Sequence, residues 1–171
     1  MVGAMIHEGM SAGHAFTQNQ RVVTVTEAAN LTGVKVMVID DSSTIRRSAE
    51  IFLVQAGCTV ILAEDGFDAL SKVSDHQPEI IFCDIMMPRL DGYQTCALIK
   101  KNPRFSSTPV VMLSSKDGLF DRARGRMVGS DEYLTKPFTR EALLKTVIAL
   151  AGSAVNPAAT VADNVDDAAR A

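Results

Sequence analysis

Five short strand-like runs, each followed by a stretch with helical periodicity, constrain the fold of this chain more than any other feature. Four of them are strongly apolar and the fifth is more polar; they cover residues 34–39, 58–63, 79–83, 110–113 and 131–135. Near-continuous apolar strands that alternate with helices are typical of a parallel sheet with helices on both faces. Right-handed crossovers make such a sheet doubly wound, so we predict a five-stranded α/β fold with strand order 2-1-3-4-5.

Helical periodicity and capping residues predict five helices. We expect them over residues 43–55, from 65, over 93–101, over 117–128 and from 139, where Thr139 is a good N-cap. Gly118 and Gly125 weaken the fourth helix. The side chains that we expect to be buried on the first, second and fifth helices are Ile45, Ala49, Phe52 and Leu53, then Phe67, Leu70 and Val73, and finally Leu143, Leu144, Val147 and Ile148.

The alternating pattern spans residues 34–150 and predicts one domain between two tails. Residues 1–33 show no sustained periodicity, and we expect a flexible extension with at most one helical turn at 26–29. Residues 151–171 are dominated by Ala and Asp and contain no apolar side chain larger than valine, so burial cannot offset the entropy of ordering them. We therefore predict that this C-terminal tail is disordered.

Composition and charge exclude several function classes. The formal net charge is −3, so nothing in the global balance favours nucleic acid or a membrane surface. The N-terminus lacks the basic region of a secretory signal, and no apolar run is long enough to span a bilayer. Cys58, Cys83 and Cys96 form no C-x-x-C pair, so we expect free, buried thiols. These features predict a cytoplasmic protein without membrane insertion.

Polar side chains follow four of the five predicted strands. Asp40 and Asp41 follow the first strand, Asp84 the third, Ser114 and Ser115 the fourth, and Lys136 and Pro137 the fifth. Because ligands of doubly wound folds bind beyond the carboxyl ends of the strands, we expect these side chains to converge. Packed carboxylates repel one another and need a cation, and oxygen ligands of this kind suit Mg²⁺.

This arrangement predicts transfer of a phosphoryl group to a carboxylate. A carboxylate attacks phosphorus, the metal spreads the charge of the transferring group, and an acyl phosphate remains on the protein. Lys136 can pair with Asp84 or with a phosphoryl oxygen, and the Ser114 hydroxyl can bond the same phosphoryl group.

Each element of this pattern also has a purely structural interpretation. Asp41 or Ser42 can cap the following helix, a Lys-Pro pair is usually a loop, and a Ser-Ser pair is common in turns. Their joint occurrence at the carboxyl ends of strands in one sheet favours the functional interpretation. Other kinds of site lack support, since the chain has no G-x-x-x-x-G-K-[ST] motif, no G-x-G-x-x-G after a strand, and no histidine at a strand end.

These residues resemble the site of the CheY-type receiver domains of two-component response regulators. Ser114 and Lys136 follow Asp84 by 30 and 52 positions, a spacing that fits that family. The resemblance covers residues 34–150 and implies a flavodoxin-like fold. It also implies that Asp84 accepts a phosphoryl group from the phosphohistidine of a histidine kinase. Mg²⁺ would be held by Asp40, Asp41, Asp84 and the backbone carbonyl of Met86.

The resemblance further implies a conformational switch. Lys136 would contact the phosphoryl group, and the Lys136–Pro137 bond would be cis. Ser114 would move toward the phosphoryl oxygens, and Tyr133 would turn inward into the space released. The face formed by the fourth helix, the fifth strand and the fifth helix would then bind a downstream protein. Such a chain is a signalling switch rather than an enzyme, since it promotes only its own phosphorylation and dephosphorylation.

Longer strings are similar to the PilG-type response regulators of twitching motility. They are DDSSTIRRSAE, DIMMPRLDGYQTCALIK, LSSKDGLFD and GSDEYLTKPF. This resemblance implies a CheA-like histidine kinase as the phosphodonor and control of type IV pili as the output. A phosphate sink or relay receiver, or a regulator of another output, stays open as an alternative. We expect no DNA partner, because the 21 residues after position 150 cannot hold a helix-turn-helix.

Two further features lead to separate hypotheses. Met86 and Lys116 lie two residues beyond Asp84 and Ser114, where receivers that lose their phosphoryl group quickly carry polar or acidic side chains. We therefore expect a comparatively long-lived acyl phosphate, and Met86 also argues against an aspartyl phosphatase, which usually has an acid at that place. Arg122, Arg124 and Arg126 are either a partner-binding surface or, as we favour, a solvated helix face.

Overall fold

A computed structural model describes residues 31–115 and 119–151 of the chain, with the side chains of 119–121 left out of the description. Within this part, a single parallel sheet has the strand order β2-β1-β3-β4-β5. This confirms the predicted doubly wound fold. The strands are β1 Lys35–Ile39, β2 Thr59–Ala63, β3 Ile80–Asp84, β4 Val110–Ser114 and β5 Glu132–Thr135.

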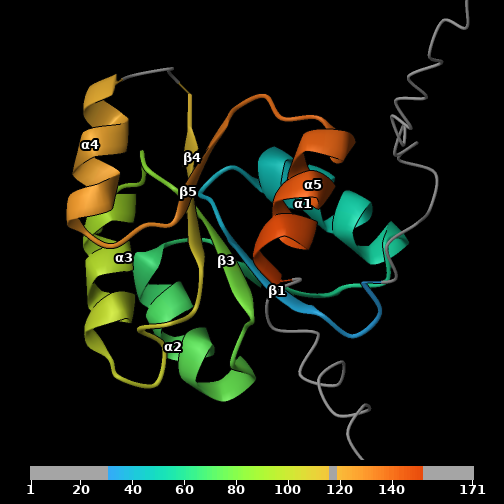
Figure 1. Ribbon diagram of the computed structural model, residues 1–171, viewed down its shortest axis with the longest axis horizontal. Helices are drawn as coiled ribbons and strands as arrows, with labels where there is room; N and C mark the ends of the chain where they lie inside the picture. The colour runs from blue at the N-terminus through green and yellow to red at the C-terminus, as the bar shows by residue number, and fades with distance from the viewer. Residues whose placement is uncertain (1–30, 116–118, 152–171) are drawn as a thin grey trace, which may run out of the picture.

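Helices cover both faces of the sheet (Figure 1). Helices α1 and α5 lie on one face, and α2, α3 and α4 lie on the other. Their bounds are α1 Ser43–Gln55, α2 Gly66–His76, α3 Gly92–Lys101, α4 Leu119–Met127 and α5 Arg140–Ala151. Wherever a start or an end of one of these ten elements was predicted, it lies within two residues of the observed one.

Local hydrogen bonds explain where the helices begin. The Ser42 side chain accepts from the backbone N–H of Ile45 at the start of α1, and Asp65 accepts from Asp68 at the start of α2. The Thr139 hydroxyl accepts from the Ala142 N–H at 3.1 Å, as expected of an N-cap. Before α3, Asp91 and Gln94 form a reciprocal capping box.

Alternating strand residues build two separate cores. Met37 and Ile39 of β1 face α2 and α3, whereas Val36 and Val38 face α1 and α5. The central strands β3 and β4 are buried along their whole length, which explains why both read as unbroken apolar runs. Because consecutive side chains point to opposite faces, one strand supplies both cores.

Two of the expected core side chains are exposed. Phe67 is 55% exposed, and α2 buries Gly66, Ala69 and Val73 instead. A Cβ at Gly66 would lie 2.3 Å from the Thr95 hydroxyl oxygen, so this glycine is pressed against α3 and the next side chain is turned outward.

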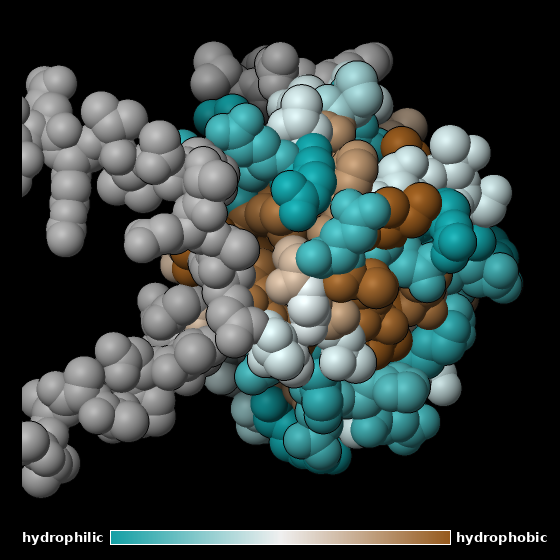
Figure 2. Space-filling model, turned by 90° about the vertical axis from the view of Figure 1, so that its right-hand side faces the viewer, coloured by the Kyte–Doolittle hydropathy of each residue, from teal (hydrophilic) through white to brown (hydrophobic). Residues whose placement is uncertain are grey.

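Ile148 is the second exception, because the buried stripe of α5 runs along Leu143, Val147 and Ala151. Figure 2 shows the side of the molecule where α1 and α5 lie, and hydrophobic side chains there interrupt the polar surface. Ile51, Val54 and Ile148 are the large hydrophobic side chains of these two helices that are exposed.

The packed part of the chain begins earlier than the predicted boundary at residue 34. Leu31 lies in the segment predicted as a flexible extension, yet its side chain is buried in the core beneath α1 and α5. The predicted turn at 26–29 and the predicted tail beyond Ala151 lie outside the described residues.

The three cysteines are free and buried, as expected. Burial raises the pKa of Cys58 and of Cys96 to about 11, so both thiols are protonated at neutral pH. In the part of the chain that the structure describes, no helix combines the length and the apolar character needed to cross a bilayer.

Candidate functional site

The site residues predicted from the sequence meet at the carboxyl edge of the sheet. Asp40 follows β1, Asp84 is the last residue of β3, and Ser114 is the last residue of β4. Asp84 pairs in register with Leu113, and Ser114 pairs with Thr135, the residue before Lys136. Parallel pairing in this register places four strand ends side by side.

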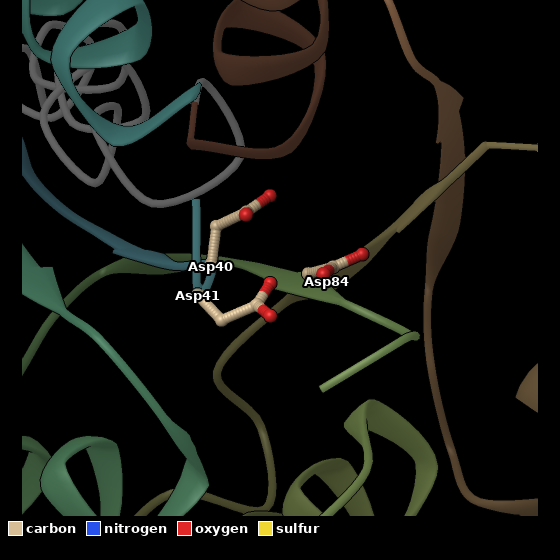
Figure 3. Close-up of side chains that lie close together, drawn as sticks. All are labelled: Asp40, Asp41 and Asp84. Carbon is tan, nitrogen blue, oxygen red and sulfur yellow. The ribbon is translucent and has the colours of Figure 1, made fainter. Parts of the chain in front are cut away.

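Three carboxylates form the centre of the site. Oxygens of Asp40, Asp41 and Asp84 lie within 4.8 Å of one another. Asp40 is 0% exposed and Asp84 is 2% exposed, whereas Asp41 is open to solvent. Figure 3 shows Asp40 and Asp41 at the end of β1 and Asp84 beside them at the end of β3.

Backbone contacts at the start of α1 hold Asp40 in place. Its Oδ1 atom accepts a hydrogen bond from the Ser42 N–H at 2.8 Å, and its carbonyl accepts from the Arg46 guanidinium at 2.6 Å. Ser42 is also the N-cap of α1, so the cap of the helix and the orientation of the carboxylate depend on the same turn.

Lys136 bridges the two buried carboxylates. Its ammonium nitrogen lies 2.9 Å from Asp84 Oδ1 and 3.0 Å from Asp40 Oδ2. Lys136 follows the edge strand β5, so its side chain passes over the end of β4 to reach β3 and β1. The Lys136–Pro137 peptide bond is cis.

The electrostatics of the cluster are unbalanced. Burial raises the pKa of Asp84 and the charge of Asp40 raises it further; Lys136 and the Met86 N–H offset this only in part. Burial by itself lowers the pKa of Lys136, but its hydrogen bonds to Asp84 and Asp40 outweigh this, and the pKa is raised. One ammonium therefore faces three carboxylates, which leaves an excess of negative charge.

This donor set fits a divalent cation. The cluster offers three carboxylates, two of them buried and one facing solvent, where an ion with its remaining waters can enter. Mg²⁺ prefers oxygen ligands and keeps several of its waters, so it suits a half-open site of this kind. The residues that would hold it are those that carry the excess charge.

Gly92 lets α3 begin directly against the strand that carries Asp84. A Cβ at Gly92 would lie 2.2 Å from the carbonyl oxygen of Asp84 and 2.8 Å from the Cα of Ile85. The Gly92 N–H also donates to the Ile85 carbonyl at 3.0 Å. No side chain larger than hydrogen fits here, so Gly92 determines the path of the backbone just after Asp84.

Arg89 anchors the loop between β3 and α3. Its backbone has a φ of 69°, its guanidinium forms an ion pair with the mostly buried carboxylate of Asp65, and it lies 5.7 Å from the centre of the Phe67 ring. Neither Gly92 nor Arg89 was predicted as a site residue. An Asp-Gly pair such as Asp91-Gly92 is typical of a turn, but nothing in the sequence indicates which elements it brings together.

The remaining predicted residues lie around this centre. Met86 has a side chain that is 74% exposed, and its backbone N–H lies 3.4 Å from Asp84 Oδ1. Ser114 is buried, and Tyr133 is half-buried on β5. Arg122, Arg124 and Arg126 are exposed on α4, whereas Lys116 lies outside the described residues.

Comparison with known proteins decides the family. The model of the response regulator receiver domain matches residues 36–148. This range runs from β1 into α5 and contains all the strand ends that form the site. The chain belongs to the response regulator receiver family. Its resemblance to CheY-type receivers is thereby confirmed.

Relatives of known sequence place this receiver close to PilG. The chain is 71% identical to protein PilG of Pseudomonas aeruginosa over 115 residues, which are 67% of this chain and 85% of that protein. It is 38% identical over 109 residues to a probable transcriptional regulator, ycf27, of Guillardia theta, of which it spans 42%. It spans about half the length of the Mycobacterium response regulators MprA that it also matches.

Solved structures show the same fold. The chemotaxis protein CheY4 of Vibrio cholerae, at 32% identity, superposes with a TM-score of 0.68 and covers 70% of this chain and 99% of its own. The receiver domain of the Pseudomonas aeruginosa sensor histidine kinase PA1611, at 26% identity, has a TM-score of 0.66 and covers 71% and 99%. That receiver was solved with a magnesium ion coordinated in its active site cleft.

Proposed function

We propose that Asp84 of this receiver is the phospho-acceptor of a chemotaxis-like phosphorelay. The observation that carries the proposal is the position of Asp84. Its carboxylate is buried at a strand end, 2.9 Å from the Lys136 ammonium, and shares a cluster with Asp40 and Asp41. A buried nucleophile with a cation on one side and carboxylates for a metal on the other is what phosphoryl transfer requires.

The reaction transfers a phosphoryl group from a phosphohistidine to the carboxylate. A bond forms between an Asp84 oxygen and phosphorus, the bond between phosphorus and the imidazole nitrogen breaks, and the leaving nitrogen keeps the electron pair. Bound Mg²⁺ supplies charge neutralisation for the transferring group. Asp40, Asp41, Asp84 and the Met86 carbonyl are the groups that would hold it. Lys136 exchanges part of its contact with Asp84 for a phosphoryl oxygen.

The phosphorylated state is read out by Ser114 and Tyr133. Ser114 ends β4 beside the strand that carries Asp84, so its hydroxyl can follow a new phosphoryl group. Tyr133 then changes position, and the face formed by α4, β5 and α5 changes with it. We propose that this face binds a downstream protein and that the exposed Arg122 and Arg126 of α4 are solvated in its absence.

The likeness to PilG supports an output in twitching motility, with a CheA-like histidine kinase as the phosphodonor. The protein then acts in the cytoplasm, where its buried free thiols stay reduced. Under this proposal the chain promotes only its own phosphorylation and dephosphorylation.

Labelling with acetyl phosphate tests the acceptor. We expect wild type to gain the mass of one phosphoryl group in the presence of Mg²⁺, and we expect almost no gain in EDTA. Asp84→Asn should stay unmodified under both conditions, while Asp75→Asn, on the exposed side of α2, should behave as wild type. Labelling of Asp84→Asn to the extent of wild type would reject the proposal.

A second experiment separates an output regulator from a phosphate sink. Wild type and Asp84→Ala are used as bait with and without a phosphoryl donor. A partner retained only by phosphorylated wild type indicates an output role. Rapid return of the label to the kinase, with no retained partner, indicates a sink or relay.

A further inference from the structure

The two tyrosines of this chain meet across separate elements. Tyr93 and Tyr133 are its only tyrosines, and the chain has no tryptophan. Their hydroxyl oxygens lie 2.9 Å apart, so one hydroxyl donates a hydrogen bond to the other. Tyr93 lies in the first turn of α3 and is 4% exposed, whereas Tyr133 is half-buried on β5.

The pairing of the strands explains this meeting. Tyr133 is in register with Met112 of β4, whose side chain belongs to the core beneath α2 and α3. The side chain of Tyr133 therefore points to the face of the sheet that carries Tyr93, and it packs against the same core.

Helix α4 is fitted to both tyrosines. A Cβ at Gly125 would lie 2.6 Å from the Ser130 hydroxyl oxygen and 2.9 Å from Cε2 of Tyr133, so the Tyr133 ring and Ser130 share the space that this glycine leaves. The Arg124 guanidinium carbon lies 4.6 Å from the centre of the Tyr93 ring, which is a cation–π contact. Any movement of the Tyr133 ring therefore changes what α4 packs against.

Only one member of the pair is fixed to the phosphorylation site. Tyr93 follows Gly92, whose backbone contacts the carbonyl of Asp84 and hydrogen bonds to Ile85. Tyr133 instead lies on the edge strand and contacts α4 and Tyr93 through its ring and hydroxyl. Tyr93 is thus the fixed partner, and Tyr133 is the side chain that can leave.

We propose that Tyr93 is a further residue of the switch: its hydroxyl holds Tyr133 against α4 in the unphosphorylated protein, and this bond opposes the phosphorylated state. The inference rests on the proposed function, because it takes Tyr133 as the side chain that moves when Asp84 is modified. A bond present in only one of two states shifts the equilibrium between them by its own free energy. Removing it should therefore favour the phosphorylated state.

The test uses protein labelled with ring-¹³C tyrosine and beryllofluoride, a stable analogue of the phosphoryl group, with Mg²⁺ present. Tyr93→Phe keeps the ring under Arg124 but leaves Tyr133 as the single labelled tyrosine. We expect its signal, without beryllofluoride, to lie part-way toward the position it takes in saturated wild type. We also expect this variant to reach half-saturation at a beryllofluoride concentration about two- to tenfold lower than wild type, which is the factor that one net hydrogen bond supplies.

A second variant displaces the Tyr133 side chain by steric contact with α4 rather than by loss of a hydrogen bond. Gly125→Ala keeps both tyrosine hydroxyls but puts a methyl group 2.6 Å from the Ser130 hydroxyl oxygen and 2.9 Å from Cε2 of Tyr133, which is too close for the ring to keep its position. It should move the Tyr133 signal in the same direction and lower the half-saturating concentration. Thr146→Val removes a hydroxyl from α5, where it bonds within the helix, and should change neither quantity.

The outcomes separate this inference from the proposed function. If wild type responds to beryllofluoride but Tyr93→Phe has the resting signal and the half-saturation of wild type, the inference is wrong and the proposed function stands. If wild type does not respond, the proposed function is wrong. In that case the inference is still tested by Gly125→Ala. If the Tyr133 signal of this variant equals that of wild type, Tyr133 does not pack against α4 and the inference is also wrong.

Discussion

At the scale of single residues, Asp84 combines burial with a need for negative charge. Its carboxylate is nearly inaccessible, which disfavours ionisation, yet in the proposed reaction only the ionised form attacks phosphorus. Lys136 supplies part of the compensation through a 2.9 Å hydrogen bond. Under the proposed function the rest comes from bound Mg²⁺, so we expect the residue to be a strong nucleophile only when the cation occupies the site.

We expect Asp84→Asn to raise the free energy of unfolding of the metal-free protein at pH 7. The pKa of Asp84 is raised in the folded state, mainly by burial and then by Asp40, so the fold binds this proton more tightly than the unfolded chain does. The ionised carboxylate therefore destabilises the fold at neutral pH, and this cost fades as the pH falls through the folded pKa.

Urea unfolding in EDTA measures the difference in free energy of unfolding between Asp84→Asn and wild type. Measurements from pH 7 to pH 4 at steps of about one pH unit follow its dependence on protonation. The excess stability of Asp84→Asn over wild type should shrink as the pH is lowered. Asp75→Asn, whose carboxylate is exposed on α2, serves as the control. A variant less stable than wild type at pH 7 would contradict this reading of the site.

Our second prediction is that Met86 lengthens the lifetime of the acyl phosphate. Its exposed thioether lies two residues beyond Asp84 and cannot position an attacking water. Met86→Asn should speed the loss of the phosphoryl group about three- to tenfold, below the full effect of a positioned catalytic group. Decay of ³²P label with Mg²⁺ present measures the rate. Met127→Asn, at an exposed methionine on α4, should decay as wild type, and equal rates for all three proteins would reject the prediction.

At the scale of elements, the connection from β3 to α3 is the part of the fold most closely tied to the chemistry. Gly92 brings the start of α3 against Asp84, and Arg89 fixes the same loop to Asp65 before α2. The capping box of Asp91 and Gln94 closes the turn between them. Three local features thus hold residues 85–91, the seven residues between β3 and α3, which include Met86, whose carbonyl is proposed as a metal ligand.

Gly92→Ala should therefore cost more than an ordinary glycine substitution. The new Cβ would lie 2.2 Å from a backbone oxygen that cannot move without shifting β3. We expect a loss of about 3 kcal/mol, at the upper end for overpacking, together with loss of labelling at Asp84.

Gly33→Ala is the matched control for this prediction. Gly33 has a φ of 84°, but a Cβ there would meet nothing within 4 Å, so only backbone strain of about 1–2 kcal/mol is expected. Urea unfolding and acetyl phosphate labelling of both variants give the comparison. Equal losses of stability with normal labelling in both would show that Gly92 has no special role.

At the scale of the whole molecule, the site couples to the stability of the entire domain. The clustered carboxylates come from β1 and β3, and the lysine comes from beyond β5, so the site exists only when the sheet is assembled. A ligand that binds the assembled site and not the unfolded chain stabilises the fold by mass action.

We therefore expect Mg²⁺ to raise the free energy of unfolding of wild type, by about 2.7 kcal/mol at a hundred times its dissociation constant. Asp41→Asn should lose most of this gain while keeping the metal-free stability of wild type, because Asp41 is exposed. Thermal or urea unfolding in MgCl₂, compared with NaCl at equal ionic strength, measures both. A gain in Asp41→Asn equal to that of wild type would exclude this carboxylate as a ligand.

The sequence by itself determined the elements and the edge at which the chemistry lies. Apolar runs such as 79–83 and caps such as Thr139 are local signals, and the parallel topology then places Asp40, Asp84 and Lys136 at one end of the sheet. Those relations follow from periodicity and connectivity, which a linear pattern carries.

Tertiary structure alone decided which side chains touch. The exposure of Phe67, the contact of Gly92 with Asp84 and the bond between Tyr93 and Tyr133 all depend on how helices settle on the sheet. Side-chain contacts between distant residues are set by close packing in three dimensions. When a helix shifts on the sheet by less than the spacing of two residues, a side chain exchanges one neighbour for another. The periodicity of the sequence does not determine the position of a helix so finely.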